Sequence, residues 1–446
     1  MRGPSLLEKF EQFALSFIDE DGYPASIPVI VVSADEQIRL KVPRGFDPRK
    51  LEGRTANLIA NHITPLPSGG YTDRRYIVFR GRVHLVEGEE LQFETLREYG
   101  WDEHRTPFPE YIEVSTNRAR AYLESLGKKL GETFKPQLGL FWSFFRTVRL
   151  PFLLATLAGV LVGGGAAFYR GYFNPVLLLL TFAGLAFIHM GLNLANDYYD
   201  TLLGADVVNR RPTPFSGGSR ALIYGIVSAS EARILFSTFF AAGIGVGIYL
   251  ALLRGPLEIG LLIVGGIFLS YFYTAPPFKL AYRGLGELAV FTGFGPLIVL
   301  GTYFVQSGSL DLTGLMASIP VGILIMLILY VNEIPDAVFD KEAGKKTLVA
   351  RLSKPGVMTL LAVFLLLVYL FIAFIPILRL GPPTVLAAFT TAPLSLRVFR
   401  NVNRNFGNQY AMISSMSLNV KNSVITCFLI AAGYFVGRLV YGVATL

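Results

Sequence analysis

The sequence has a single cysteine, Cys427, so the chain has no internal disulfide. Cys427 lies within an apolar run, and we expect it to be buried by packing. Charge is also scarce, since 16% of the 446 residues are charged whereas 52% are hydrophobic. The first residues, MRGPSLLEKFEQF, carry charges and no uninterrupted apolar core, so no secretory signal is expected.

The low charge is not spread evenly along the chain. Residues 1–135 have charges scattered among short apolar runs, as in a soluble protein, whereas long apolar runs dominate from about Phe141 onward. The composition changes between residues 130 and 150, and a chain of this length commonly forms two or three domains. We therefore predict a soluble domain at 1–135, an amphipathic linker at 136–149 and a membrane domain at 150–446.

Apolar runs of about 20 residues, the length that crosses a bilayer as a helix, recur through the membrane domain. They predict an all-α, multi-pass domain of about nine transmembrane helices. The runs are 150–169, 176–196, 231–252, 257–274, 287–305, 317–336, 356–378, 381–397 and 422–441.

Lysine and arginine gather in the loops that follow the even-numbered runs, on the side of the N-terminal domain. The opposite loops contain little beyond Arg170, Arg254 and Arg379. Because the basic loops of membrane proteins stay in the cytoplasm, we expect the N-terminal domain and the loops after even-numbered runs to be cytoplasmic, in a protein of the cell membrane. This topology explains part of the net charge of +8, and nucleic-acid binding is not expected.

Two clusters of acidic and amide residues end the second and the sixth run. In the first cluster, Asn196 and Asp200 are four residues apart and share a helical face, which Asn193 and His189 extend. The same stretch, NDYYDTLLGAD, adds Asp197 and Asp206. In the second, NEIPDAVFDKEAGKKTL, the spacing of four recurs in Asn332, Asp336 and Asp340.

Carboxylates grouped at two helix ends suit Mg²⁺, which keeps several waters and is commonly held by one or two carboxylates and by phosphate oxygens. Nearby arginine and lysine side chains would bind the rest of a diphosphate. These basic residues are Arg210, Arg211, Arg220, Lys279, Arg283, Lys341 and Lys345. The pattern therefore predicts a site for a metal and an isoprenyl diphosphate at the cytoplasmic membrane boundary, above an apolar cavity.

Other interpretations account for parts of this pattern. An acidic helix end also occurs as an N-cap or a solvated loop, although two clusters with the same spacing argue against that reading for both. The ion site of a transporter also places acids in membrane helices, but such acids more often lie near the midplane than at helix ends. His189 by itself is expected to hydrogen-bond between helices rather than to bind a ligand.

At these residues the chain resembles the UbiA superfamily of intramembrane prenyltransferases, whose two aspartate-rich motifs match NDYYDTLLGAD and NEIPDAVFD. The resemblance covers roughly 140–446 and implies Mg²⁺ bound by Asn196, Asp197, Asp200, Asp206, Asp336 and Asp340. It implies substrate contacts from Asn193, Asn196, Ser219, Arg220, Arg283, Asn332 and Lys341. It implies catalytic roles for Asp200, Asp336, Lys279 and Tyr273. Tyr273 would stabilise an allyl cation, or else be an ordinary interfacial aromatic residue.

Within the superfamily, several stretches resemble the 1,4-dihydroxy-2-naphthoate prenyltransferases. They are SGGSRALIYGIVS, YTAPPFKLAYRGLGELAVFTGFGPLIVLGTYFVQ, DKEAGKKTLVARL and the asparagine that opens the second motif. The resemblance implies that the ring of an aromatic acceptor attacks the allyl cation and that its carboxyl group leaves as carbon dioxide. Two alternatives stay open, namely geranylgeranyl transfer to a glycerol-phosphate acceptor and a flavin-linked membrane quinone oxidoreductase.

Residues 1–135 alternate apolar and polar positions as β-strands do, with a turn at DEDGYP. The stretches SLLEKFEQFALSFIDEDGYPASIPVIVV and FRGRVHLVEGEE resemble the flavin-binding split barrels related to pyridoxamine phosphate oxidase. This resemblance implies a β split barrel and FMN, whose phosphate would be bound by Arg39, Lys41, Arg44 or Lys50. The alternative is a barrel without flavin that regulates the enzyme or joins two chains in a homodimer.

Overall fold

The structure, a computed structural model, describes residues 4–34, 38–65, 71–86, 90–106, 140–209, 217–223 and 226–442, with the separate positions 111, 115, 118, 121, 125, 127–129, 131, 213 and 215. The chain forms two compact units, Met1–Leu126 and Gly127–Leu446. Arg210 and Arg211, two of the predicted diphosphate-binding residues, lie outside the described residues. The predicted linker begins outside them too, and its later part forms α2 (Leu140–Thr147).

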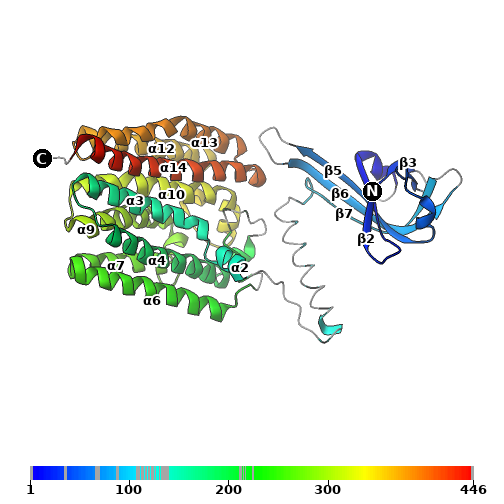
Figure 1. The fold of residues 1–446 in the computed structure, drawn as a ribbon, viewed down its shortest axis with the longest axis horizontal. Helices are drawn as coiled ribbons and strands as arrows, with labels where there is room; N and C mark the ends of the chain where they lie inside the picture. Colours follow the sequence, from blue (N-terminus) through cyan, green and yellow to red (C-terminus); the bar gives the residue numbers. More distant parts are fainter. Residues whose placement is uncertain are drawn as a thin grey trace. The chain divides into compact units, whose positions relative to one another are not determined.

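The N-terminal unit is a curled, antiparallel sheet of seven strands in the order β2-β1-β5-β6-β7-β4-β3 (Figure 1). The strands are β1 (Gln12–Ile18), β2 (Pro24–Pro28), β3 (Ile30–Ala34), β4 (Ile38–Lys41), β5 (Thr55–Pro65), β6 (Tyr71–Leu85) and β7 (Glu90–Asp102). Alternation along the strands buries Leu15, Leu40, Leu58 and Leu91 completely. This sheet is consistent with the predicted split barrel.

The predicted turn DEDGYP joins β1 to β2. The Asp19 carboxylate accepts hydrogen bonds from the backbone amides of Asp21, at 3.0 Å, and of Tyr23, at 2.8 Å. Gly22 has a φ of +86°, in the left-handed region that glycine enters without steric cost. The short polar side chain and the glycine together reverse the chain, so that β1 and β2 pair antiparallel.

The second unit is helical, and each of the nine predicted runs falls on a helical segment. The long elements are α3 (Leu153–Tyr169), α4 (Pro175–Leu202), α6 (Ala229–Arg254), α7 (Pro256–Tyr271), α8 (Gly286–Thr292), η5 (Gly293–Leu300), α9 (Gly301–Ser307), α10 (Leu312–Glu342), α12 (Lys354–Ile377), η6 (Pro383–Thr391), α13 (Ala392–Asn405) and α14 (Gln409–Tyr441). Shorter ones are η3 (Leu150–Phe152), α5 (Ala205–Val208), η4 (Leu280–Arg283) and α11 (Leu348–Arg351).

The predicted count of nine transmembrane helices is not confirmed. In the part of the chain that the structure describes, seven helical spans are long and apolar enough to cross a membrane, and α8, η5 and α9 together make one of them. The helix α7 has only 16 residues. The eighth run is divided between the 3₁₀ helix η6 and α13, which carries Arg397, Arg400 and Arg404. The short helix α7 and the divided eighth run therefore account for the difference between the nine predicted spans and the seven found among the described residues.

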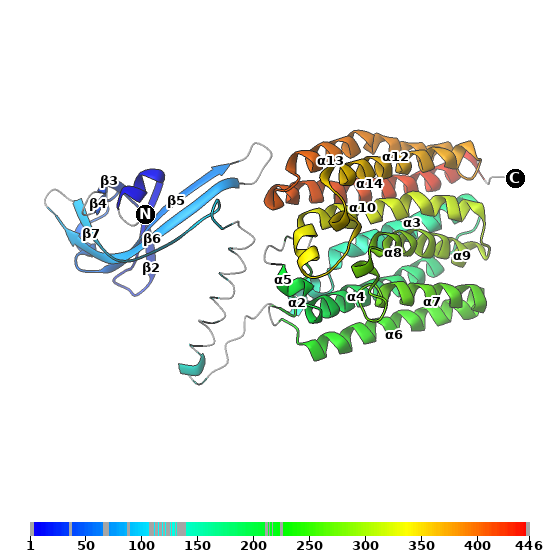
Figure 2. The ribbon, with the colours of Figure 1, turned by 180° about the vertical axis from the view of Figure 1, so that it is seen from behind.

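The helices of this unit run side by side in three layers. Figure 1 and Figure 2 show α3 and α10 in the middle, α4, α6 and α7 on one side, and α12, α13 and α14 on the other. The largest core cluster joins the middle layer to the α12–α14 side, and it includes the fully buried Tyr303, Tyr330 and Tyr434. Cys427 is free and completely buried in this cluster, as the sequence predicted.

Gly163 allows α3 to pack closely against η5. A Cβ atom at this position would lie 2.3 Å from the carbonyl oxygen of Val299, a backbone atom that cannot rotate away. We expect Gly163→Ala to destabilise the helical unit by about 1–3 kcal/mol, the usual cost of overpacking. The matched control is Gly260→Ala on α7, where a Cβ would meet nothing within 4 Å. Equal thermal unfolding midpoints for the two variants in detergent would contradict the close packing.

Candidate active site

A cavity of about 360 Å³ lies inside the helical unit. Its apolar part is lined by α4, α6, α7, η5 and α9, and its polar part by the C-terminal ends of α4 and α10 with the loops that follow them. Along α4 the lining extends from Thr181 to Asp200, which at 1.5 Å per residue is about 28 Å. That length is close to the thickness of the hydrocarbon core of a bilayer.

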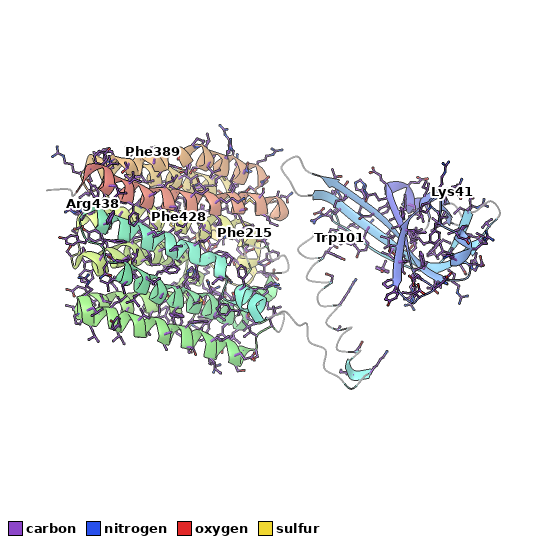
Figure 3. All side chains as sticks on the ribbon, in the orientation of Figure 1. Lys41, Trp101, Phe215, Phe389, Phe428 and Arg438 are labelled. Carbon is purple, nitrogen blue, oxygen red and sulfur yellow. The ribbon has the colours of Figure 1, made fainter. Side chains whose placement is uncertain are left out.

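Figure 3 indicates the two ends of the helical unit. Phe215, which lines the cavity, is labelled at the end where the acidic motifs lie, and Arg438 of α14 is labelled at the opposite end. The cavity therefore combines a polar end at one membrane boundary with an apolar interior that runs toward the other.

The first motif lies on the last turns of α4. Asn193 and Asn196 line the cavity, and the Asn193 side-chain amide donates to the carbonyl oxygen of Val148 at 2.9 Å. Asp200 accepts a hydrogen bond from the Tyr282 hydroxyl at 2.7 Å and forms an ion pair with Lys345 at 3.5 Å. Asp200, which the sequence places at the membrane boundary, is therefore paired with a tyrosine and a lysine from two other segments of the chain.

Asp197 has a different environment from its neighbours in the motif. Its carboxylate accepts hydrogen bonds from the Arg149 guanidinium and from the hydroxyl and backbone amide of Ser219. It is buried, and among the described residues it is not one of those that line the cavity. Asp197 therefore anchors the loop at Ser219 and the start of the first membrane span to α4.

The loop after α4 is held by Arg220, which is buried. Its guanidinium donates to the carbonyl oxygens of Asp206, at 2.9 Å, and of Asn209, at 3.0 Å. Asn209 in turn donates from its side-chain amide to Asp336 at 3.2 Å. These contacts link the first motif to the second, and they place the Asp206 side chain in the polar end of the cavity.

The second motif lies on α10, which runs without interruption through Pro335. Asn332, Asp336 and Asp340 all line the cavity, as the spacing of four residues predicts for one helical face. The two motifs therefore face each other across the polar end, although they are separated by more than 120 residues in the sequence.

The predicted basic residues are not equally close to this end. Lys345 lines the cavity, and although burial opposes its charge, Asp200 and Asp340 raise the pKa of Lys345 well above its ordinary value. The described residues that line the cavity do not include Arg220, Lys279, Arg283 or Lys341. The Lys279 ammonium lies 5.9 Å from the centre of the Tyr282 ring. The Arg283 guanidinium donates a hydrogen bond to the carbonyl oxygen of Pro277. The Lys341 side chain is exposed.

The donor atoms at the polar end suit a hard cation. Asn196 Oδ1, Asp206 Oδ2 and Asn332 Oδ1 are buried oxygens that accept no hydrogen bond from the described residues. Among those residues, no three His, Cys, Asp or Glu side chains converge closely enough to enclose a metal by themselves. Amide and carboxylate oxygens that leave coordination positions free are the environment in which Mg²⁺ binds together with phosphate oxygens and water.

Sequence reasoning missed several residues of the cavity. Arg149, Asn209 and Glu333 line it, and Tyr282 bonds directly to Asp200. A signal for Arg149 existed, because a lone arginine at the start of an apolar run must find an acidic partner or leave the membrane. For Tyr282 no sequence signal existed, since its contact depends on the path of a loop. Tyr273 was predicted, and it lines the cavity next to the second motif.

Residues 152–419 match the UbiA prenyltransferase family. The 1,4-dihydroxy-2-naphthoate octaprenyltransferase of Escherichia coli is 26% identical over 73% of this chain and 98% of its own length. The enzyme of the same name from Mycobacterium tuberculosis is 32% identical over 57% of this chain and 83% of its own length.

A solved structure of a UbiA homolog from Archaeoglobus fulgidus, bound to GPP and Mg²⁺, is 16% identical. It covers 65% of this chain and 99% of its own, with a TM-score of 0.46. The family match spans more than half of the chain and includes both acidic motifs that line the cavity. The chain belongs to the UbiA prenyltransferase family.

Proposed function

We propose that this chain transfers a polyprenyl group from an isoprenyl diphosphate to an aromatic acceptor, 1,4-dihydroxy-2-naphthoate, and that the reaction requires Mg²⁺. The observation that carries the proposal is the cavity, whose polar end joins two acidic motifs and whose apolar part extends over about the thickness of a bilayer. An isoprenyl diphosphate has the same two parts, a charged head and a long apolar tail. Relatives named as 1,4-dihydroxy-2-naphthoate octaprenyltransferases support the choice of acceptor.

The two motifs would hold the metal against the diphosphate. The ligands we assign are Asn196, Asp200, Asp206, Asp336 and Asp340, all of which line the cavity. Bound Mg²⁺ would neutralise the charge that develops on the departing pyrophosphate. Asp197 is already occupied by Arg149 and Ser219, and we assign it, with Ser219, to positioning the loop instead of the metal.

Cationic and aromatic side chains would complete the site. Lys345 is held at the polar end by Asp200, and we assign it to stabilising the pyrophosphate as it leaves. Tyr273 presents an aromatic ring to the cavity, where it would stabilise the allyl cation. Arg220 positions the loop through two carbonyl groups. Contacts of Lys279, Arg283 and Lys341 with the diphosphate stay a prediction.

The membrane topology follows from the same arrangement. The family, with the seven apolar spans in the part of the chain that the structure describes, makes this a multi-pass membrane protein. We propose that the polar end of the cavity faces the cytoplasm, because the lysine- and arginine-rich loops lie at that end. A cysteine introduced at the exposed Lys341 would then react with a membrane-impermeant thiol reagent only after the cells are opened.

The function is tested by the mass of the product. Membranes containing the full chain are incubated with Mg²⁺, geranylgeranyl diphosphate and one acceptor at a time. We expect a prenylated, decarboxylated naphthoquinol from 1,4-dihydroxy-2-naphthoate, and we expect none when Mg²⁺ is chelated. A product from geranylgeranylglyceryl phosphate alone would instead assign the chain to lipid synthesis. Redox turnover that needs neither Mg²⁺ nor an isoprenyl diphosphate would favour a quinone oxidoreductase.

The function of the half-barrel is a separate hypothesis. The four residues proposed for a flavin phosphate are all exposed, and Lys50 pairs with Glu20 at 3.9 Å. Lys41, labelled in Figure 3, follows the buried Leu40 on β4 and points away from the core. This geometry gives FMN no support, and a homodimer through the half-barrel stays a prediction. FMN binding is tested by the flavin absorbance of the gently purified full chain. The homodimer is tested by the molar mass of the full chain in detergent.

A further inference from the structure

Two glycines in the wall of the cavity do not have the role that glycine usually has in a membrane domain. Gly266 of α7 and Gly293, the first residue of η5, both line the cavity. Glycine in membrane helices usually lets two backbones approach each other closely. A Cβ atom at Gly266 or at Gly293, however, would meet none of the described atoms within 4 Å. Close packing therefore does not explain these two residues.

Other glycines of the same wall do serve close packing. A Cβ atom at Gly243 of α6 would lie 2.9 Å from the carbonyl oxygen of Gly184 on α4, so the two helices cross where both residues lack a side chain. At Gly266 and Gly293 the missing side chain leaves open space instead. Because both residues line the cavity, that space adds to the room for a ligand.

The open side of Gly266 faces the cavity and not the lipid. Three exposed apolar residues of α7 have the spacing of one helical face, and they are Leu257, Leu261 and Val264. Gly266 comes two residues after Val264 and is therefore rotated by about 200° around the helix axis, away from that face. Gly260 of the same helix also has open space beside it, but it is not among the described residues that line the cavity.

Both glycines lie at a similar depth in the cavity. Gly266 comes seven residues before Tyr273, at the polar end. Gly293 comes seven residues after Gly286, where a Cβ atom would lie 3.4 Å from the Tyr273 hydroxyl oxygen. At 1.5 Å per residue, each glycine is roughly 10 Å deeper than this level. The cavity lining continues along α4 to about 28 Å, so most of the apolar part lies beyond the two glycines.

The position of the ligand head decides which tails pass this level. At the polar end Asn332 Oδ1 is buried, lines the cavity and accepts no hydrogen bond from the described residues, so the head has its partners there. A dimethylallyl group is a single isoprene unit and ends before it reaches Gly266. A geranylgeranyl group consists of four such units and has to extend past both glycines.

We propose that Gly266 and Gly293 determine the length of the prenyl group that this chain accepts, because they keep the cavity open where a long tail passes. The inference rests on the proposed prenyl transfer. A side chain at either position would project from α7 or from η5 into the passage, and the deeper part of the cavity would be closed to the tail. The polar end lies roughly 10 Å away and would keep its geometry.

The test compares kcat/KM for geranylgeranyl diphosphate and for dimethylallyl diphosphate, with the full chain in membranes, Mg²⁺ and 1,4-dihydroxy-2-naphthoate. We expect Gly266→Leu and Gly293→Leu each to lower kcat/KM for the long donor by about 10–100-fold, the discrimination that an apolar pocket achieves by steric fit. For the short donor the change should be less than about threefold. Gly260→Leu is the matched control on α7 and should equal wild type with both donors.

Binding of non-hydrolysable thio analogues of the two donors gives the same comparison without turnover. The inference is overturned if both cavity variants weaken the two donors equally, if neither variant affects the long donor, or if Gly260→Leu has the same effect. If the wild-type chain binds the long analogue but transfers no prenyl group to any aromatic acceptor, the proposed function fails, and binding alone then decides the role of the glycines. A wild-type chain that does not bind the long analogue would contradict both.

Discussion

Asp200→Asn and Asp336→Asn are each expected to lower prenyl transfer by about 10²–10³-fold. Each substitution removes a negative charge from the site that we assign to Mg²⁺ and the diphosphate, and a loss of this size is typical when a group that stabilises developing charge is removed. The Mg²⁺ concentration needed for half-maximal rate should rise at the same time. The measurement is product formation in membranes as a function of Mg²⁺ concentration.

The control for these variants is Glu342→Gln, which removes an exposed carboxylate from the end of the helix that carries Asp336. This variant should keep both the rate and the Mg²⁺ dependence of the wild-type chain. If Asp200→Asn and Asp336→Asn transferred the prenyl group as fast as the control, the two motifs would not be the metal site.

Arg149→Met is expected to lower the stability of the helical unit by about 3–5 kcal/mol, the cost of removing one partner of a buried ion pair. The Asp197 carboxylate, whose side chain is 2% exposed, would keep its hydrogen bond from Ser219 but lose its ion pair with Arg149. For a unit of this size the thermal midpoint in detergent should fall on the order of 10 °C. Transfer should fall as well, because the loop at Ser219 borders the cavity.

The double variant Arg149→Met, Asp197→Asn provides the control. It removes both charges, so it should be more stable than Arg149→Met alone, with a coupling free energy of about 1–3 kcal/mol between the two positions. If the changes in the free energy of unfolding from the two single substitutions simply add up in the double variant, the ion pair contributes nothing specific to the stability of the fold.

The helical period explains which parts of the site could be predicted from the sequence. A spacing of four residues keeps side chains on one face, so Asn196 with Asp200, and Asn332 with Asp336 and Asp340, were correctly grouped on one cavity. The same rule also explains the different position of Asp197. One residue after Asn196 it is rotated by about 100° around the axis, and it meets Arg149 and Ser219 instead of the cavity.

The loops explain what could not be predicted. The sequence predicts roles for Lys279, Arg283 and Lys341 because they lie in the loops after the fourth and sixth apolar runs. The direction of a loop side chain, however, depends on the backbone path. Lys279 has a φ of +47° and points toward Tyr282, whereas Lys345, four residues after Lys341, enters the cavity.

Span counting has a similar limit. Each of the nine apolar runs falls on a helical segment, but hydropathy does not distinguish an α-helix from the 3₁₀ helix η6, and it does not detect that α7 is short. In the half-barrel, alternation of apolar residues predicts strands with one buried face, such as β1 and β4, whereas the middle of β7 is exposed on both faces and carries no such signal. The strand order depends on pairing between distant segments, such as β4 with β7, which alternation does not specify.

The release of the acceptor carboxyl group tests the proposed reaction most directly. Membranes containing the full chain receive Mg²⁺, geranylgeranyl diphosphate and 1,4-dihydroxy-2-naphthoate labelled with ¹³C in the carboxyl group, and labelled carbon dioxide is measured against prenylated product. We predict one carbon dioxide per prenyl group transferred, and neither product in Asp200→Asn. A prenylated product that retains the label would contradict the proposed naphthoate reaction, and carbon dioxide release without a prenylated product would contradict prenyl transfer at this site.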